Sequence, residues 1–184
     1  MKKINWYALY SQTGSEIDTI SKTLGVKPTF VITDNHTGPI DNLGRYTQLI
    51  CMNRETVEHK LLYLAAKDDI VTLHGYKRII SARTVMTLLE RGVKLFNGHP
   101  GAIDLYPELK GLDPQRRAIE EGYTTVGCVI HKVTPELDGG QIVMSRHIKV
   151  APSDLATYEK LHTLMTDMWI EFLSKGENDV RQTC

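Results

Sequence analysis

Short apolar runs alternate with amphipathic segments of helical period through the first half of this 184-residue chain. The alternation is typical of right-handed β-α-β units, in which successive strands run parallel. The sequence therefore predicts an α/β protein with a Rossmann-like open sheet, mostly parallel, and helices on both faces. The expected strands are 4–10, 28–33, 46–52, 69–73 and 93–96, and the expected helices are 17–24, 54–66 and 82–91.

The second half predicts a different pairing. Two runs of strand composition, 124–133 and 141–150, flank a turn at 134–140, and strands joined by a short connection are antiparallel. We therefore expect an antiparallel hairpin beside the parallel strands. A helix is expected at 114–122, and a long one follows Pro152 and Ser153. We expect residues 1–184 to form a single domain, because a chain of this length suits one hydrophobic core.

Composition excludes several classes of protein. Lys and Arg total 22 and Asp and Glu total 22, so no global field favours nucleic acid or an anionic membrane. Cys51, Cys128 and Cys184 are widely spaced, which disfavours a disulfide framework or a structural zinc site. No apolar run approaches the ~20 residues that span a bilayer, and the first residues lack a signal peptide. We expect a cytoplasmic protein, and the sequence does not indicate an oligomeric state.

Polar side chains follow the expected strand 93–96. Asn97 and His99 are two residues apart, so they share one face in extended backbone, at the carboxyl end where open α/β sheets bind ligands. The amide can donate to a carbonyl oxygen and the imidazole can move a proton near pH 7. A histidine near a turn is also often a locally hydrogen-bonded residue. Asp138, before two glycines, is likewise explained by turn formation alone.

Two loops are candidate binding segments. Ser11 to Glu16 joins a strand to a helix, a junction that suits a phosphate or carboxylate, although Ser and Thr there are also plain helix caps. His74 to Ser81 follows another strand and mixes apolar with cationic residues. It is suited to a flat, partly apolar ligand, but Ile79 and Ile80 are equally consistent with a turn that joins the core.

Three segments together resemble a known signature. Residues 97–100 (Asn-Gly-His-Pro), 107–111 (Pro-Glu-Leu-Lys-Gly) and 136–140 (Glu-Leu-Asp-Gly-Gly) are similar to the pattern of the folate-dependent formyltransferase family. This family includes glycinamide ribonucleotide, methionyl-tRNA and sugar nucleotide formyltransferases. The resemblance covers nearly the whole chain: 69–80 is similar to the family's folate-pocket segment, and 11–15 resembles the phosphate loop of the glycinamide ribonucleotide enzymes.

The resemblance implies 10-formyltetrahydrofolate as formyl donor, a primary amine as acceptor and no metal. It implies that Asn97 and protonated His99 donate to the developing oxyanion, while Asp138 holds the imidazolium and helps to take the amine proton. The pteridine would be held by the backbone of Lys77, Arg78, Ile79 and Ile80 and by Leu137. Ser11, Thr13, Gly14, Ser15 and His162 would face the acceptor. His131 is not assigned a role, because alternation along its strand could equally turn its side chain to solvent.

The departures from the family pattern concern the acceptor. In comparison with the glycinamide ribonucleotide enzymes, Gln12 stands where they usually carry glycine and Glu16 where they carry asparagine. His162 stands where they carry a glutamate. We therefore expect an aminated sugar or nucleotide whose phosphate meets the loop 13–15, rather than glycinamide ribonucleotide. Methionyl-tRNA enzymes carry a further domain after this point, so a tRNA acceptor is not expected, and nor is another nucleic acid. Alternatives left open are a glycinamide ribonucleotide formyltransferase after all, a methionyl-tRNA formyltransferase, hydrolysis of the donor by water, and a non-catalytic folate- or nucleotide-binding domain.

Overall fold

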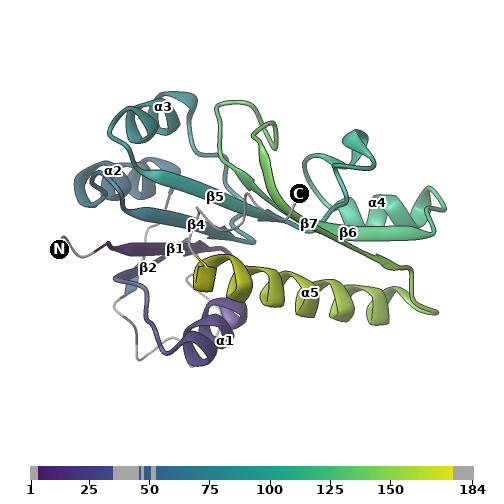
Figure 1. The fold of residues 1–184 in the computed structure, drawn as a ribbon. Helices are drawn as coiled ribbons and strands as arrows, with labels where there is room; N and C mark the ends of the chain where they lie inside the picture. The colour runs from purple at the N-terminus through teal and green to yellow at the C-terminus, as the bar shows by residue number, and fades with distance from the viewer. Residues whose placement is uncertain (1–3, 35–45, 47, 51–52, 176–184) are drawn as a thin grey trace.

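The computed structural model describes residues 4–34, 46, 48–50 and 53–175. In this part of the chain seven strands form one sheet in the order β3-β2-β1-β4-β5-β6-β7 (Figure 1). The strands are β1 (Trp6–Tyr10), β2 (Phe30–Thr33), β3 (Gln48–Ile50), β4 (Ile70–His74), β5 (Lys94–His99), β6 (Thr125–Lys132) and β7 (Ile142–Lys149). The helices are α1 (Ser15–Leu24), α2 (Arg54–Leu64), α3 (Ala82–Glu90), α4 (Pro114–Glu120) and α5 (Asp154–Lys175), with a 3₁₀ turn, η1, at Pro107–Leu109.

Strands β1 to β5 pair in parallel, whereas β6 is antiparallel to both β5 and β7. The predicted fold class is therefore confirmed. From β1 the chain first builds outward through β2 and β3, then returns to add β4 on the other side of β1. The carboxyl ends of β1 and β4 thus form a topological switch point, where the loops diverge and open sheets bind ligands.

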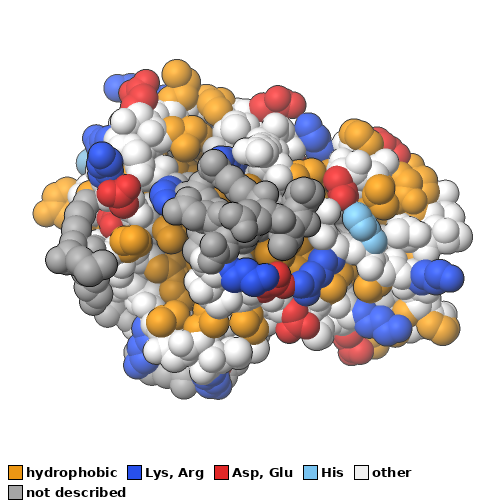
Figure 2. All heavy atoms as spheres, viewed as in Figure 1, with side chains coloured by type: hydrophobic (Ala, Val, Ile, Leu, Met, Phe, Trp, Pro, Cys, Tyr) orange, Lys and Arg blue, Asp and Glu red, His pale blue; other side chains and the backbone are white. Residues whose placement is uncertain are grey.

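Two hydrophobic layers cover the sheet. Trp6, Ala8 and Tyr10 point into the layer shared with α1 and α5, whereas Tyr7 and Leu9 point into the layer shared with α2 and α3. This alternation along β1 is what a central strand buried on both faces requires. Helix α5 runs along the sheet beside α1, opposite α2 and α3 (Figure 1). Charged side chains of both signs are interspersed over the face drawn in Figure 2, consistent with the balanced composition.

Most expected elements lie within a few residues of their predicted bounds, but one boundary differs in a way that matters. The strand expected to stop at Phe96 continues to His99, because Asn97, Gly98 and His99 pair with β6. The glycine and the following proline did not end it, since a strand is terminated by loss of its partners. Most of the expected loop at 34–44, and the tail beyond Lys175, lie outside the described residues.

Candidate active site

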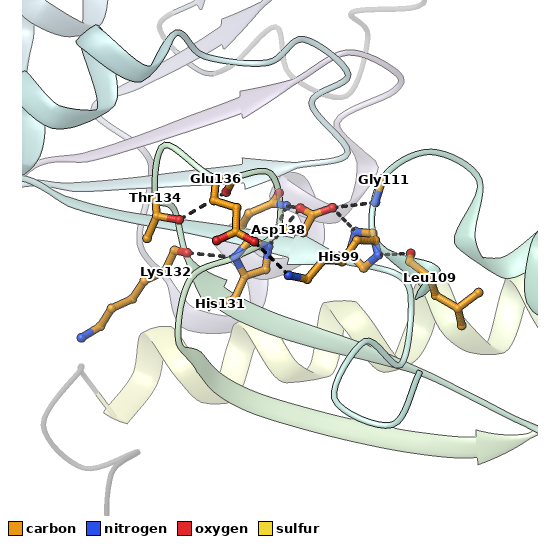
Figure 3. Close-up of polar contacts among 10 residues, drawn as sticks. His99, Leu109, Gly111, His131, Lys132, Thr134, Glu136 and Asp138 are labelled. Atoms are coloured by element: carbon orange, nitrogen blue, oxygen red, sulfur yellow. Dashed lines mark hydrogen bonds and ion pairs between the residues drawn. The ribbon is translucent and has the colours of Figure 1, made fainter. Parts of the chain in front are cut away.

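The candidate catalytic residues are brought together by strands β5 and β6. Asn97 and His99 lie at the carboxyl end of β5, and the antiparallel register places His131 of β6 directly opposite Asn97. The connection from β6 to β7 then carries Asp138 back over this edge, where its carboxylate lies between His99 and His131 (Figure 3). The structure thus gathers the three predicted side chains, together with His131.

The Asp138 carboxylate makes four polar contacts. Its Oδ2 accepts the Gly111 backbone N–H at 2.9 Å and lies 3.4 Å from His99 Nδ1. Its Oδ1 lies 3.3 Å from His131 Nε2 and 3.4 Å from Asn97 Nδ2. Burial alone would raise the pKa of this carboxyl group, but the two histidines and the Gly111 N–H outweigh burial and lower the pKa to about 2. Asp138 is therefore a stable anion at neutral pH.

The His99 ring is buried with both nitrogens facing acceptors. Its Nε2 lies 3.0 Å from the Leu109 carbonyl oxygen, and its Nδ1 faces Asp138. Burial lowers the pKa of His99, an effect that the Asp138 carboxylate and the Leu109 carbonyl offset only in part. The ring is thus mainly neutral at pH 7. Once it gains a proton, both N–H groups have acceptors in place.

Asn97 is oriented by His131. Because His131 Nδ1 donates to the Lys132 carbonyl oxygen at 2.9 Å, the role of Nε2 depends on the charge of the ring. In the neutral ring Nε2 accepts the Asn97 side-chain N–H at 3.1 Å, and in the protonated ring it donates to Asp138 Oδ1 at 3.3 Å. The expected oxyanion donors, the Asn97 amide and His99, are therefore directed at protein atoms in this state. Asn97 makes two contacts, and the one to Asp138 is the longer and weaker. The N–H group in this contact is therefore the one that a ligand oxygen can take over most easily.

A cavity of about 400 Å³ adjoins this cluster at the switch point. Gly98 and Pro100, the neighbours of Asn97 and His99, form part of its wall. The loop before α1 and the start of that helix, the end of β4 at His74, Gln115 of α4 and one side of α5 also line it. A cavity of this size lies within the usual range for small-molecule sites.

The comparisons with known proteins agree with this architecture. A family model described as formyl transferase matches residues 17–172. The chain belongs to the formyl transferase family. The methionyl-tRNA formyltransferase of Thermotoga neapolitana is 30% identical over 147 residues, 76% of this chain and 44% of that protein. The phosphoribosylglycinamide formyltransferase of Escherichia coli K12 is 37% identical over 86 residues, 47% of this chain and 38% of that protein.

A solved structure shares the fold over almost the whole chain. The phosphoribosylglycinamide formyltransferase of Anaplasma phagocytophilum superposes with a TM-score of 0.82 at 22% identity, covering 97% of this chain and 88% of that one. This likeness shows the fold. The chain spans less than half the length of the two curated relatives above.

The residues that the sequence assigned to the acceptor line the cavity only in part. Thr13, Gly14, Ser15 and His162 line the cavity, and His162 Nε2 lies 3.5 Å from Ser15 Oγ. Ser11 is not among the lining residues, because its hydroxyl accepts the Lys77 backbone N–H at 2.9 Å and so links the loop to the segment after β4.

The residues expected to hold the pteridine divide into exposed and buried members. Ile79 and Leu137 are 61% and 51% exposed, whereas Ile80 joins the core and Arg78 pairs with Asp34 at 2.5 Å. The loops that carry them are both anchored to the layer of α2 and α3, through Tyr76 and Val133. Exposed apolar side chains on two loops anchored to one layer fit a flat, partly apolar donor. Among the described residues there is no cluster suited to a metal ion and no helix long and apolar enough to span a membrane.

Sequence reasoning missed His131. Its strand is buried along nearly its whole length, so alternation could not show which way the ring points. The only available signal was its position seven residues before Asp138, at the entrance to the same turn.

Proposed function

We propose that this protein transfers the formyl group of 10-formyltetrahydrofolate to a primary amine on a small acceptor. The observation that carries the proposal is the Asp138 carboxylate held against His99, beside a cavity at the switch point of the sheet. The donor supplies the reactive formyl carbon. The chain has to orient it, stabilise charge on its oxygen and remove a proton from the attacking nitrogen.

The residue roles follow from their surroundings. With a pKa of about 2, Asp138 is a poor base by itself, so its charge serves to stabilise a protonated His99. His99, neutral at pH 7, is the group that gains the amine proton, through Asp138 or a water molecule, and this proton is then returned to the folate nitrogen as its bond to the formyl carbon breaks. Asn97 supplies an N–H to the formyl oxygen when its weaker contact to Asp138 is released. One such donor is worth about 10²–10³ in rate.

The donor would lie against the loops 77–80 and 134–138. Backbone groups of Lys77 to Ile80 hold the ring edge, and Ile79 and Leu137 cover its apolar part. The amine then approaches from the cavity on the other side of β5, past Gly98. Donor and acceptor thus reach Asn97 and His99 from different sides.

A purely binding role has no use for this cluster. Four polar side chains, three of them buried, converge on one point and are connected by hydrogen bonds. Burying such groups is costly unless they are paired, and nothing in the fold of the sheet requires them there. Hydrolysis of the donor by water would use the same residues, so the assay has to measure both products.

The test is Asp138→Asn, which keeps the shape of the side chain. Formylated amine and deformylated folate are followed separately with the panel of amines described below. We expect kcat to fall at least ~10²-fold while circular dichroism shows an intact fold. The matched control is Asp104→Asn, because Asp104 also pairs with a histidine, His147 at 3.0 Å, outside the site. Equal activity of both variants would contradict the assignment, and folate release without formylated amine would indicate a hydrolase.

A further inference from the structure

The cavity wall carries negative rather than positive side chains. Glu16 and Glu159 are among its lining residues, as are His74 and His162, whereas no Lys or Arg lines it in the described part of the chain. Phosphate sites normally combine backbone N–H groups with a cationic side chain. The only groups here that can become cationic are two imidazoles, and one of these is already paired with a carboxylate.

That pair, Glu16 and His74, is fixed in place. His74 Nδ1 lies 2.6 Å from Glu16 Oε2, and its Nε2 lies 2.7 Å from Thr72 Oγ1. The same Thr72 oxygen accepts the Trp6 indole N–H at 2.7 Å, and the His74 ring packs against Trp169 at 4.7 Å between centroids. The side chains of His74 and Glu16 are 1% and 13% exposed. Glu16 therefore cannot swing away to admit an anion without breaking a buried network.

The positive end of the α1 dipole is already offset by acidic side chains of the helix itself. Glu16 and Asp18 both lie in its first turn, where acidic side chains offset the helix dipole. Asp18 is also engaged, accepting the Tyr46 hydroxyl at 3.1 Å and pairing with Lys22 at 2.7 Å. A phosphate bound at this terminus would face the Glu16 carboxylate, and Asp18 in the same turn offsets the helix dipole further, so the usual electrostatic attraction of a helix start is weakened.

Hydrogen-bonding capacity nevertheless remains. The first turn of a helix leaves backbone N–H groups without partners inside the helix, and Gly14, the N-cap, offers no side chain to cap them. Thr13 and Ser15 add hydroxyl groups at the same wall. Hydroxyl groups of a ligand can both accept from N–H groups and donate to carboxylates. An uncharged polyol satisfies this mixture, whereas a phosphate, which at neutral pH accepts far more hydrogen bonds than it donates, does not.

We infer that the part of the acceptor seated in this cavity is an uncharged, hydroxyl-bearing body, such as an amino sugar without a phosphate at that end, and that Glu16 is the residue that excludes phosphate. The inference rests on the proposed function for the presence of an amine, and it deepens that function by naming the substrate class. It differs from the sequence-based expectation that the loop 13–15 holds a phosphate.

The experiment uses amines in matched pairs with and without a phosphate. The pairs are D-glucosamine with D-glucosamine 6-phosphate, and glycinamide riboside with glycinamide ribonucleotide. Binding to the full chain is measured by calorimetry without formyl donor, so the result is independent of whether formyl transfer occurs. We expect at least one unphosphorylated amine to bind below 10 mM, and about tenfold more tightly than its phosphorylated partner.

Variants assign the effect to Glu16. Glu16→Gln keeps an acceptor for His74 but removes the charge, and should shift the ratio of dissociation constants about tenfold towards the phosphorylated amine. Glu55→Gln, in the first turn of α2, is the matched control and should leave the ratio unchanged. Tighter binding of any phosphorylated member, no binding of any unphosphorylated member, or an unchanged ratio in Glu16→Gln would each overturn the inference. A confirmed preference without formylation would instead count against the proposed function alone.

Discussion

Asp138 occupies a backbone conformation that few side chains tolerate, with φ of 47°. Asp and Asn adopt this left-handed region more readily than most other residues with a side chain, so the turn and the carboxylate are supplied by one residue. The sequence could indicate Asn97, His99 and Asp138, because they lie in segments that resemble the family signature. His131 could not be predicted, because its place opposite Asn97 depends on the register between β5 and β6, which pairs two residues that lie 34 positions apart in the sequence.

The His131 ring is expected to act by positioning Asn97. In His131→Phe the amide loses its acceptor at 3.1 Å and can rotate, while the new ring still fills a buried site. We expect kcat to fall roughly 10- to 100-fold with little change in KM, because misplacement of a catalytic group affects the transition state. His147→Phe, which removes the histidine paired with Asp104, is the control. A raised KM with normal kcat would show that His131 serves donor or acceptor binding instead.

At the scale of elements, the approach of α5 to β5 depends on Gly98. A Cβ at this position would lie 2.7 Å from Trp169 Nε1 and 2.9 Å from Met165 Sδ. The sequence showed the apolar run of β5 and the helical spacing of apolar residues in α5, but it did not show how closely the two elements approach. The distance between a helix and the strand it packs on depends on which side chains meet at their contact. The continuation of β5 to His99 escaped prediction for the same reason, since it depends on β6 as a partner.

Gly98→Ala tests this close packing. The added methyl must displace Trp169 or shift β5, so we expect the free energy of unfolding to fall by about 1–3 kcal/mol in urea denaturation. A double-mutant cycle with Trp169→Phe supplies the control, because the smaller ring relieves the contact. The two changes should then cost less together than the sum of each alone. Strict additivity would show that Gly98 is required for another reason.

At the scale of the whole molecule, acid stability should depend on the buried cluster. The folded-state pKa values of His99 and Asp138 are both lowered, so each contributes stability at higher pH that is lost as pH falls. The loss from His99 begins below its ordinary pKa of about 6.5. The loss from Asp138 begins near its ordinary value of 3.8 and is complete below about 2. The balanced surface charge contributes no comparable bias near neutrality.

Chemical unfolding of Asp138→Asn across pH isolates the second contribution. At pH 7 the variant should be less stable than the unmodified protein by about 2 kcal/mol, the value that corresponds to the lowered pKa. The difference should shrink between pH 4 and pH 2, since the carboxylate becomes protonated first in the unfolded protein and then in the folded protein over this range. A difference that does not vary with pH would mean that the carboxylate is not stabilised as an anion in the fold.

Helix α5 presents different residues to the two parts of the site. Glu159 and His162 lie on the cavity wall near its start, whereas Met165, which also lines the cavity, and Trp169 lie further along and set the position of β5 through Gly98. The first pair is exposed and the second is buried. Under the proposed function, substitutions on the early turns of this helix would change acceptor preference without disturbing the reaction. A library randomised at Glu159 and His162 is the natural starting point for re-engineering the acceptor, with the later turns left unaltered.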